Sequence, residues 1–172
     1  MLTPYDLNKN EWDNLCYALG TIVVAWSLVE QPLDFCVAII YHNCGGKDIS
    51  EKYKNEVPRS MNVKIKLLKR YFKKLDILSP YKDVALNILK VSNEFAIIRN
   101  DIIHMRLMGR NHDGSYLFDK IEYRAKHKSR LITYSITQLQ EVGKEIQSLA
   151  INIVSLCQVL QEKFAPKELC QR

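Results

Sequence analysis

The sequence predicts an all-α protein, a bundle of four to five helices with a short β-hairpin or extended insertion before the last long helix. Apolar residues recur at intervals of three and four over most of the chain, the spacing of an amphipathic helix. Only six glycines and five prolines interrupt its 172 residues. One stretch, between residues 115 and 135, has the alternating aromatic and β-branched pattern of strands. At this length we expect a single domain over residues 1–172.

The first helix is predicted from Trp12 to about His42, with a bend at Pro32. Its apolar residues follow a helical spacing: Leu15, Leu19, Ile22, Val23, Trp26, Val29, Leu33, Val37 and Ile40. The run Asn43-Cys44-Gly45-Gly46 ends this helix, because glycine is the usual residue after a helix C-terminus. A second helix is expected after Ser60, whose side chain can cap it.

The third helix is predicted from the Ser-Pro pair at 79–80, a cap followed by a proline suited to the first helical position, to about Met108. The hairpin that follows has a charged turn at 124–130. Thr and Gln at 137 and 140 have the spacing of a capping box, so the last helix is expected to begin there and to end near Phe164.

Positive charge is concentrated in two segments. The chain carries 25 Lys and Arg against 19 Asp and Glu, a formal charge of +6. The range 59–74 holds seven basic residues and no acidic one, and the range 110–130 holds six against three. A polyanion, nucleic acid first, is therefore the expected partner, although such runs are also typical of a solvated helix face. The candidate nucleic-acid-binding residues are Lys66, Arg70, Lys73, Arg124, Lys126 and Lys128.

We expect a soluble, cytoplasmic protein that does not bind membranes. The longest apolar run, Thr21 to Trp26, is followed by Glu30 and looks too short and too polar to span a bilayer. The first six residues lack the basic region of a signal peptide. Five cysteines without a C-x-x-C pair are expected to be free thiols, and no ligand spacing predicts a metal site.

The candidate chemistry lies in the segment Arg99-Asn100-Asp101-Ile102-Ile103-His104 of the third predicted helix. At 100° per residue, Asn100 and His104 share a face with Ile97, and Arg99 lies at its flank. The opposite face is the predicted core stripe: Val91, Phe95, Ile98, Ile102 and Met105. A histidine beside an apolar residue on a face away from the core suggests that another surface covers them.

This segment resembles the HEPN superfamily, which is marked by an arginine, four to six further residues and a histidine on a late helix of a helical bundle. Arg99 and His104 fit with four residues between them, and Asn100 supplies the usual polar residue after the arginine. Arg106 and His112 match the same spacing, but that match crosses the predicted helix break at Gly109. The first helix, with Trp26-Ser27-Leu28-Val29-Glu30, also looks like that of HEPN proteins.

The resemblance implies a metal-independent endoribonuclease without a cofactor. The 2′-hydroxyl of RNA attacks the phosphorus and leaves a 2′,3′-cyclic phosphate and a 5′-hydroxyl. His104 suits a general base or acid, and Arg99 would clamp the phosphoryl oxygens. Asn100 would orient His104 or donate to the phosphate. Glu30 is a weaker catalytic candidate, with a surface carboxylate or a salt bridge to Arg99 as the simpler interpretation.

The resemblance also implies a homodimer in which both motifs line one cleft, and a role in bacterial defence or as a toxin. A protein antitoxin or defence partner is compatible with such a role. Two alternatives stay open. One is a non-catalytic HEPN-like module for dimerisation or RNA binding, and the other is a structural bundle in which the motif arose by chance.

Overall fold

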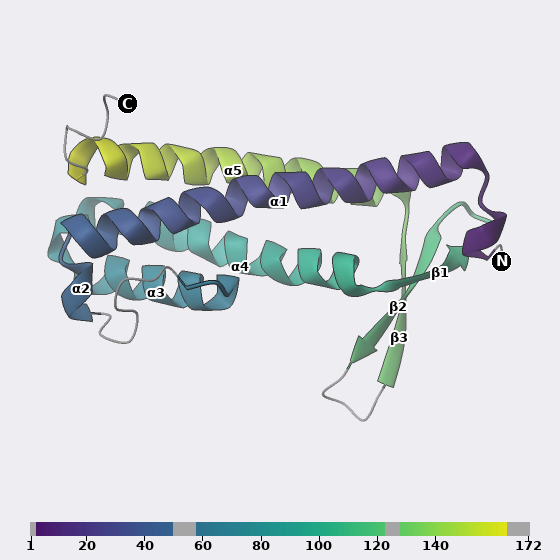
Figure 1. The fold of residues 1–172 in the computed structure, drawn as a ribbon, viewed down its shortest axis with the longest axis horizontal. Helices are drawn as coiled ribbons and strands as arrows, with labels where there is room; N and C mark the ends of the chain where they lie inside the picture. Colours follow the sequence, from purple (N-terminus) through teal and green to yellow (C-terminus); the bar gives the residue numbers. More distant parts are fainter. Residues whose placement is uncertain (1–2, 50–57, 123–127, 165–172) are drawn as a thin grey trace. The chain divides into compact units, whose positions relative to one another are not determined.

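The computed structural model of the chain describes residues 3–49, 58–122 and 128–164, and helices dominate them (Figure 1). The helical fold class is therefore confirmed at this coarse level. The described residues form five α-helices: α1 (Lys9–Asn43), α2 (Gly46–Ile49), α3 (Met61–Lys74), α4 (Lys82–His104) and α5 (Ile136–Phe164). The 3-10 helices Pro4–Asp6 and Asp76–Tyr81 precede α1 and α4. The strands are β1 (Arg106–Arg110), β2 (Tyr116–Glu122) and β3 (Lys128–Tyr134).

The chain forms two compact units, and α1, α4 and α5 each contribute to both. The first unit comprises Met1–Trp26 and Ile97–Ile146, and the second comprises Ser27–Ala96 and Gln147–Arg172. Buried apolar side chains fill each unit. In the first unit they include Leu15, Ile22, Ile102, Tyr116, Phe118, Leu139 and Ile146. In the second unit they include Val29, Leu33, Ile40, Leu68, Tyr71, Phe72, Leu89 and Leu160.

The insertion before α5 is a three-stranded antiparallel sheet in the order β1-β2-β3, one strand more than the predicted hairpin. The predicted extension of the third helix to Met108 is wrong, because α4 ends at His104 and the next residues pair with β2. Gly109 permits this pairing of β1 with β2, since its φ of 149° lies in a region that residues other than glycine rarely adopt. A register shift between Leu107 and Gly109 accompanies that conformation and marks a β-bulge.

Two predicted boundaries also shift. The 3-10 helix Asp76–Tyr81 takes in the Ser-Pro pair, so α4 begins only at Lys82. The box that caps α5 is formed by Ser135 and Gln138, two residues before the predicted pair. The Gln138 amide donates to Ser135 Oγ at 3.1 Å, and the Ser135 amide donates to Gln138 Oε1 at 2.8 Å. Helix α5 ends at Phe164, as predicted.

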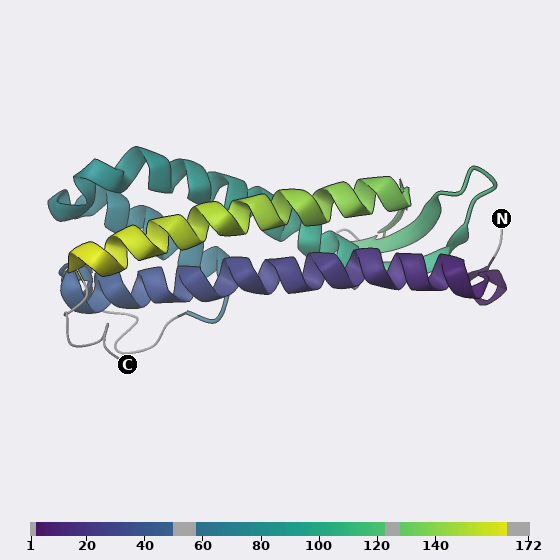
Figure 2. The same ribbon diagram turned by 90° about the horizontal axis from the view of Figure 1, so that it is seen from above.

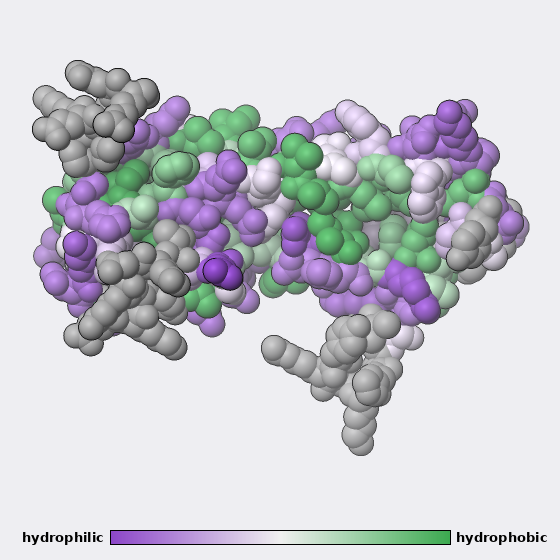
Figure 3. Space-filling view, in the orientation of Figure 1, coloured by the Kyte–Doolittle hydropathy of each residue, from purple (hydrophilic) through white to green (hydrophobic). Residues whose placement is uncertain are grey.

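Helix α1 is continuous through Pro32, and Figure 2 shows its ribbon from above. It is long and apolar enough, by length and composition, to span a membrane, so the expectation that this stretch is too short and too polar is wrong. Core helices pass the same test, and α1 contributes buried residues to both units. Exposed apolar side chains on α1 include Tyr17, Val24, Leu28 and Phe35. Figure 3 shows apolar surface interspersed with polar surface on one face of the molecule.

Two glycines test the packing of the helices. A Cβ on Gly46 would lie 2.8 Å from the carbonyl oxygen of Ile40 and 2.8 Å from Cα of Tyr41, too close for any real contact. Gly46→Ala should therefore lower the free energy of unfolding by about 1–3 kcal/mol. A Cβ on Gly20, inside α1, would meet nothing within 4 Å. Gly20→Ala should raise that free energy by about 0.5–1 kcal/mol. Equal changes for the two variants in urea denaturation would contradict this packing.

Candidate functional site

The motif residues lie at the C-terminal end of α4, within the first unit. His104 is the last residue of the helix, and the amide of Met105 donates to the carbonyl oxygen of Asp101 at 3.0 Å to close its final turn. Asn100 and His104 are exposed, as the helical spacing predicts. Ile97, one turn before Asn100 and two before His104, is 57% exposed although it is apolar. The predicted exposed face is therefore present over the last two turns of α4.

A cleft of about 290 Å³ opens beside His104. Its walls come from the end of α4, the first residues after it and the middle of β2. The lining residues are Asn100, Asp101, His104, Met105, Arg106, Asp119 and Lys120. Because β1 follows α4 directly and pairs with β2, the sheet brings two residues of β2 to the helix end that bears the motif.

Two ion pairs cross this cleft. Nζ of Lys120 lies 2.7 Å from Oδ2 of Asp101, and the two side chains are 30% and 27% exposed. Nη2 of Arg106 lies 3.1 Å from Oδ2 of Asp119, whose side chain is only 9% exposed against 66% for Arg106. The other oxygen of Asp119, Oδ1, is buried without a hydrogen-bond partner in the described part of the chain. The cleft therefore combines an imidazole and an amide with two cations that are each held by a carboxylate.

Tyr134 of β3 lies near the first of these pairs. Burial raises the pKa of its phenol, and the negative charge of Asp101 raises it further, while Lys120 and Arg130 oppose the shift. Its ring also packs edge-on against Phe118, with 6.0 Å between the centroids. The phenol is therefore protonated at neutral pH and can donate a hydrogen bond.

Arg99 does not line the cleft, contrary to the prediction that it acts beside His104. Its Nη1 donates to Asn100 Oδ1 at 3.0 Å, and its Nε is buried without a hydrogen-bond partner among the described residues. Arg99 follows Ser92 and Ala96 at helical spacing, and both of these are buried. The buried line of α4 thus runs through small residues, whereas three members of the predicted core stripe, Val91, Phe95 and Ile98, are only half-buried.

The sequence contains one signal that the buried face of α4 runs through small residues and not through the predicted core stripe. Small residues allow close helix packing, and a buried serine is tolerated when its hydroxyl bonds to the preceding turn. Ser92 Oγ donates to the carbonyl oxygen of Ile88 at 2.8 Å in this way. By contrast, no signal in the sequence identifies four of the residues that line the cleft: Asp101, Arg106, Asp119 and Lys120. Their proximity depends on the register of β1 against β2, which no local pattern specifies.

The other predicted site residues lie elsewhere. Glu30 is half-buried on α1 in the second unit and is not among the residues of the cleft. Lys66, Arg70 and Lys73 are exposed on α3, also in the second unit. Lys64, in the same basic run, is instead buried, with its Nζ 2.5 Å from Oδ1 of Asp34. It therefore holds α3 to α1 within that unit.

The remaining basic candidates and the second motif match give no further site residue. Arg124 and Lys126 lie outside the described residues, and Lys128 begins β3, in register with Glu122 of β2. The Arg106–His112 match is not helical, because Arg106 belongs to β1 and His112 to the following turn.

Cysteine and metal chemistry add little to the site. Cys16, Cys36, Cys44 and Cys157 are free, as predicted, and Cys170 lies outside the described residues. Within the described ranges, no group of three or more His, Cys, Asp or Glu side chains is placed to hold a metal ion.

Comparison with known proteins gives no family: no protein-family model, curated protein or solved structure matches the chain. The resemblance to the HEPN superfamily therefore stays one of the motif residues and of the first helix, and the chemistry of the site must be argued from the residues of the cleft.

Proposed function

We propose that the protein is a metal-independent endoribonuclease of the HEPN type that acts from the cleft at the end of α4. One observation carries the proposal. His104 is exposed in a cleft that also holds Asn100 and the cationic side chains of Arg106 and Lys120. An imidazole that can accept or donate a proton, beside groups that bind a phosphate, is a suitable arrangement for cleaving RNA.

The reaction uses the nucleophile that RNA itself supplies. His104 accepts the proton of the 2′-hydroxyl as its oxygen forms a bond to phosphorus, and the bond from phosphorus to the 5′-oxygen breaks. Asn100 donates from its amide to a phosphoryl oxygen, while its carbonyl oxygen accepts from Arg99. The 5′-oxygen takes up a proton from water or from the His104 of a second chain. The products are a 2′,3′-cyclic phosphate and a 5′-hydroxyl.

Basic residues outside the cleft support binding of the RNA backbone. Lys66, Arg70 and Lys73 are exposed on α3, and Lys128 begins β3. The chain as a whole carries a formal charge of +6, which favours a polyanionic partner. Such an enzyme would act in the cytoplasm in defence or as a toxin, with an antitoxin or defence protein as its regulator.

A homodimer fits the exposed face of α4. Ile97 is an apolar side chain left exposed two turns before His104, and a second copy of this face would cover it. In a two-fold dimer the same residue occurs twice around one axis, so two His104 side chains could serve as base and acid.

A non-catalytic RNA-binding or dimerisation module of the same kind is the second candidate. The position of Arg99 favours it, because a guanidinium that is partly buried and bonded to Asn100 is poorly placed to stabilise charge on a phosphate in the cleft. The two candidates differ in one respect, since only the enzyme loses an activity when His104 is removed.

The purified protein should cleave single-stranded RNA, and His104→Ala should lower the rate by about 10²–10⁴-fold, because His104 is the only imidazole among the described residues that line the cleft. Mass spectrometry of the fragments should find 2′,3′-cyclic phosphate ends, and a substrate with a single deoxyribose at the scissile position should resist. His112→Ala is the matched control and should cleave like the wild type. Cleavage that persists in His104→Ala would contradict the proposal, and RNA binding without cleavage would favour the second candidate.

Light scattering should give a dimer, twice the chain mass of 20.0 kDa. Ile97→Glu should dissociate it, because burying an unpaired carboxylate in the interface is unfavourable. Val84→Glu replaces an equally exposed apolar residue of α4 in the second unit and should leave the dimer intact. A monomeric wild-type protein, or equal effects of the two substitutions, would contradict an interface around Ile97.

A further inference from the structure

We infer that Lys120 of β2 is the residue that binds the scissile phosphate of RNA in this cleft, and that Asp101 holds Lys120 in its place until RNA displaces it. This inference rests on the proposed function. It assigns the phosphate-binding role to the sheet, not to the arginine of the helical motif. It also makes the Asp101 carboxylate an internal competitor of the substrate.

The position of Lys120 is the first argument. Its ammonium lies in the same cleft as His104 and Asn100, 2.7 Å from Oδ2 of Asp101. An ammonium binds carboxylate and phosphate oxygens through the same charge-assisted hydrogen bonds. Asp101 is adjacent in sequence to Asn100 and lines the cleft with it. An anionic oxygen therefore already occupies the place where a phosphoryl oxygen would meet Lys120.

The partial exposure of this ion pair makes the exchange possible. The side chains of Lys120 and Asp101 are 30% and 27% exposed, so water can solvate the carboxylate when the ammonium leaves it. Exposed and half-exposed ion pairs contribute little to stability, so a dianionic ligand or a polyanion can break one without great cost. The protonated phenol of Tyr134, whose pKa the charge of Asp101 helps to raise, is a nearby neutral donor.

Arg106 and Arg99 are less suited to the role. Arg106 is paired with Asp119, whose carboxylate is almost fully buried and whose Oδ1 lacks a partner among the described residues. Removing the guanidinium would leave a buried charge uncompensated, which is strongly unfavourable. Arg99 is bonded to Asn100 and does not line the cleft. Of the two cations that line the cleft, Lys120 is therefore the one whose release from its partner costs less.

The neighbours of Lys120 also favour the exchange. Arg130 lies opposite Lys120 in the register of β2 and β3, so two positive charges face each other across the strands. Like charges in directly opposed positions destabilise a sheet, and an anion between them relieves the repulsion. Asp101 neutralises Lys120 in the free protein, and a phosphate would do so in the complex.

The test is a double-mutant cycle on RNA binding. The probe is a single-stranded RNA with 2′-O-methyl groups at every position, which cannot be cleaved, and fluorescence anisotropy gives its Kd at about 0.15 M salt. Lys120→Gln should weaken binding about fivefold or more, and Lys120→Arg should restore most of it. Asp101→Asn should tighten binding about threefold, because the competing carboxylate is gone. In the Lys120→Gln background, Asp101→Asn should change the Kd by less than about twofold.

A charge control separates this effect from the overall field of the protein. Lys144 is exposed on α5 in the same unit, and Lys144→Gln removes the same charge outside the cleft. It should change the Kd by less than about twofold. Circular dichroism of each variant establishes that it is folded. The rescue by Lys120→Arg excludes an effect of misfolding alone.

The outcomes separate this inference from the proposed function. If the wild type cleaves RNA through His104 but Lys120→Gln binds the probe normally, the inference is overturned and the proposed function stands. The inferred exchange of the Asp101 carboxylate for a phosphate would also be overturned by weaker RNA binding of Asp101→Asn. The same holds if Asp101→Asn tightens RNA binding equally with and without Lys120. If the wild type binds no RNA, the proposed function and this inference both fail.

Discussion

The antiparallel pairing of β1 with β2 is the interaction on which the candidate site depends. Helix α4 ends at His104 and the chain enters β1 two residues later, so the sheet begins where the motif ends. The register that places Arg106 opposite Asp119 also brings Lys120 to Asp101. A slip of one residue would move every side chain of β2 to the other face of the sheet. Without this register, the exposed His104 would lack the wall of the cleft that Asp119 and Lys120 form.

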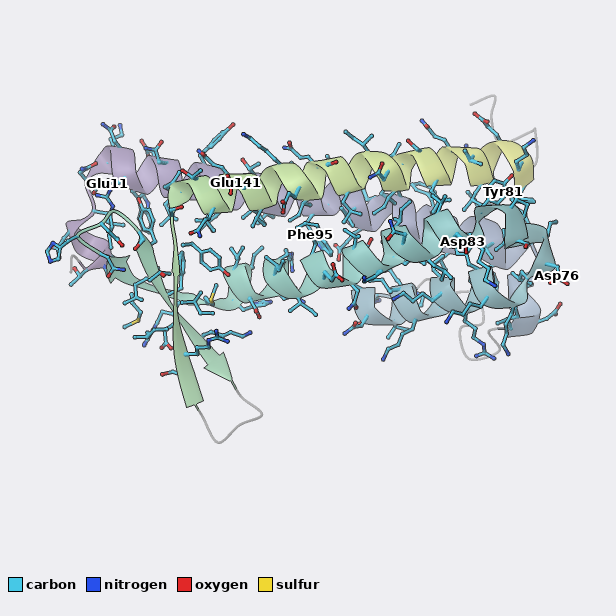
Figure 4. All side chains as sticks on the ribbon, turned by 180° about the vertical axis from the view of Figure 1, so that it is seen from behind. Glu11, Asp76, Tyr81, Asp83, Phe95 and Glu141 are labelled. Atoms are coloured by element: carbon cyan, nitrogen blue, oxygen red, sulfur yellow. The ribbon has the colours of Figure 1, made fainter. Side chains whose placement is uncertain are left out.

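The first turns of α1 hold this sheet in place within the first unit. Arg110, the last residue of β1, forms an ion pair with Glu11, and its guanidinium lies 5.9 Å from the ring centroid of Tyr116. The phenol of Tyr116 donates to the carbonyl oxygen of Glu11 at 3.0 Å. Figure 4 labels Glu11 at the start of α1, next to the β1–β2 turn. A half-buried ion pair and a buried tyrosine thus hold both strands that build the cleft.

The 3.6-residue period is sufficient to predict the four long helices and the exposed face of α4, but neither the short α2 nor the ends of α4. Asn100 and His104 can be placed on that face from their spacing alone. The core face of the same helix differs from the predicted stripe because the small residues Ser92 and Ala96 are buried, whereas larger apolar residues of that stripe are only half-buried. Strand β1 was missed because Arg106 to Met108 continue an apolar helical pattern, and only pairing with β2 makes them extended.

The ion pairs of the cleft lay beyond sequence reasoning for a different reason. Asp101 and Lys120 are nineteen residues apart, and Arg106 and Asp119 thirteen. Their contact depends on a bulge at Gly109 and on the length of the β1–β2 turn, neither of which a charge pattern reveals. Arg99 is the opposite case, a residue that the sequence pattern predicts for the site but whose side chain does not line the cleft. A motif match by spacing identified it, yet its side chain bonds to Asn100 and its Nε is buried.

The central claim is that RNA binds in the cleft at the end of α4, and chemical-shift mapping tests it most directly. Titration of the ¹⁵N-labelled protein with the 2′-O-methyl RNA should shift the amide signals of residues 100–106 and of Asp119 and Lys120 together, at one affinity. The signals of Lys66, Arg70 and Lys73 on α3 report separately on the second basic surface. Shifts confined to α3, with the signals of the cleft unchanged at saturation, would contradict the account.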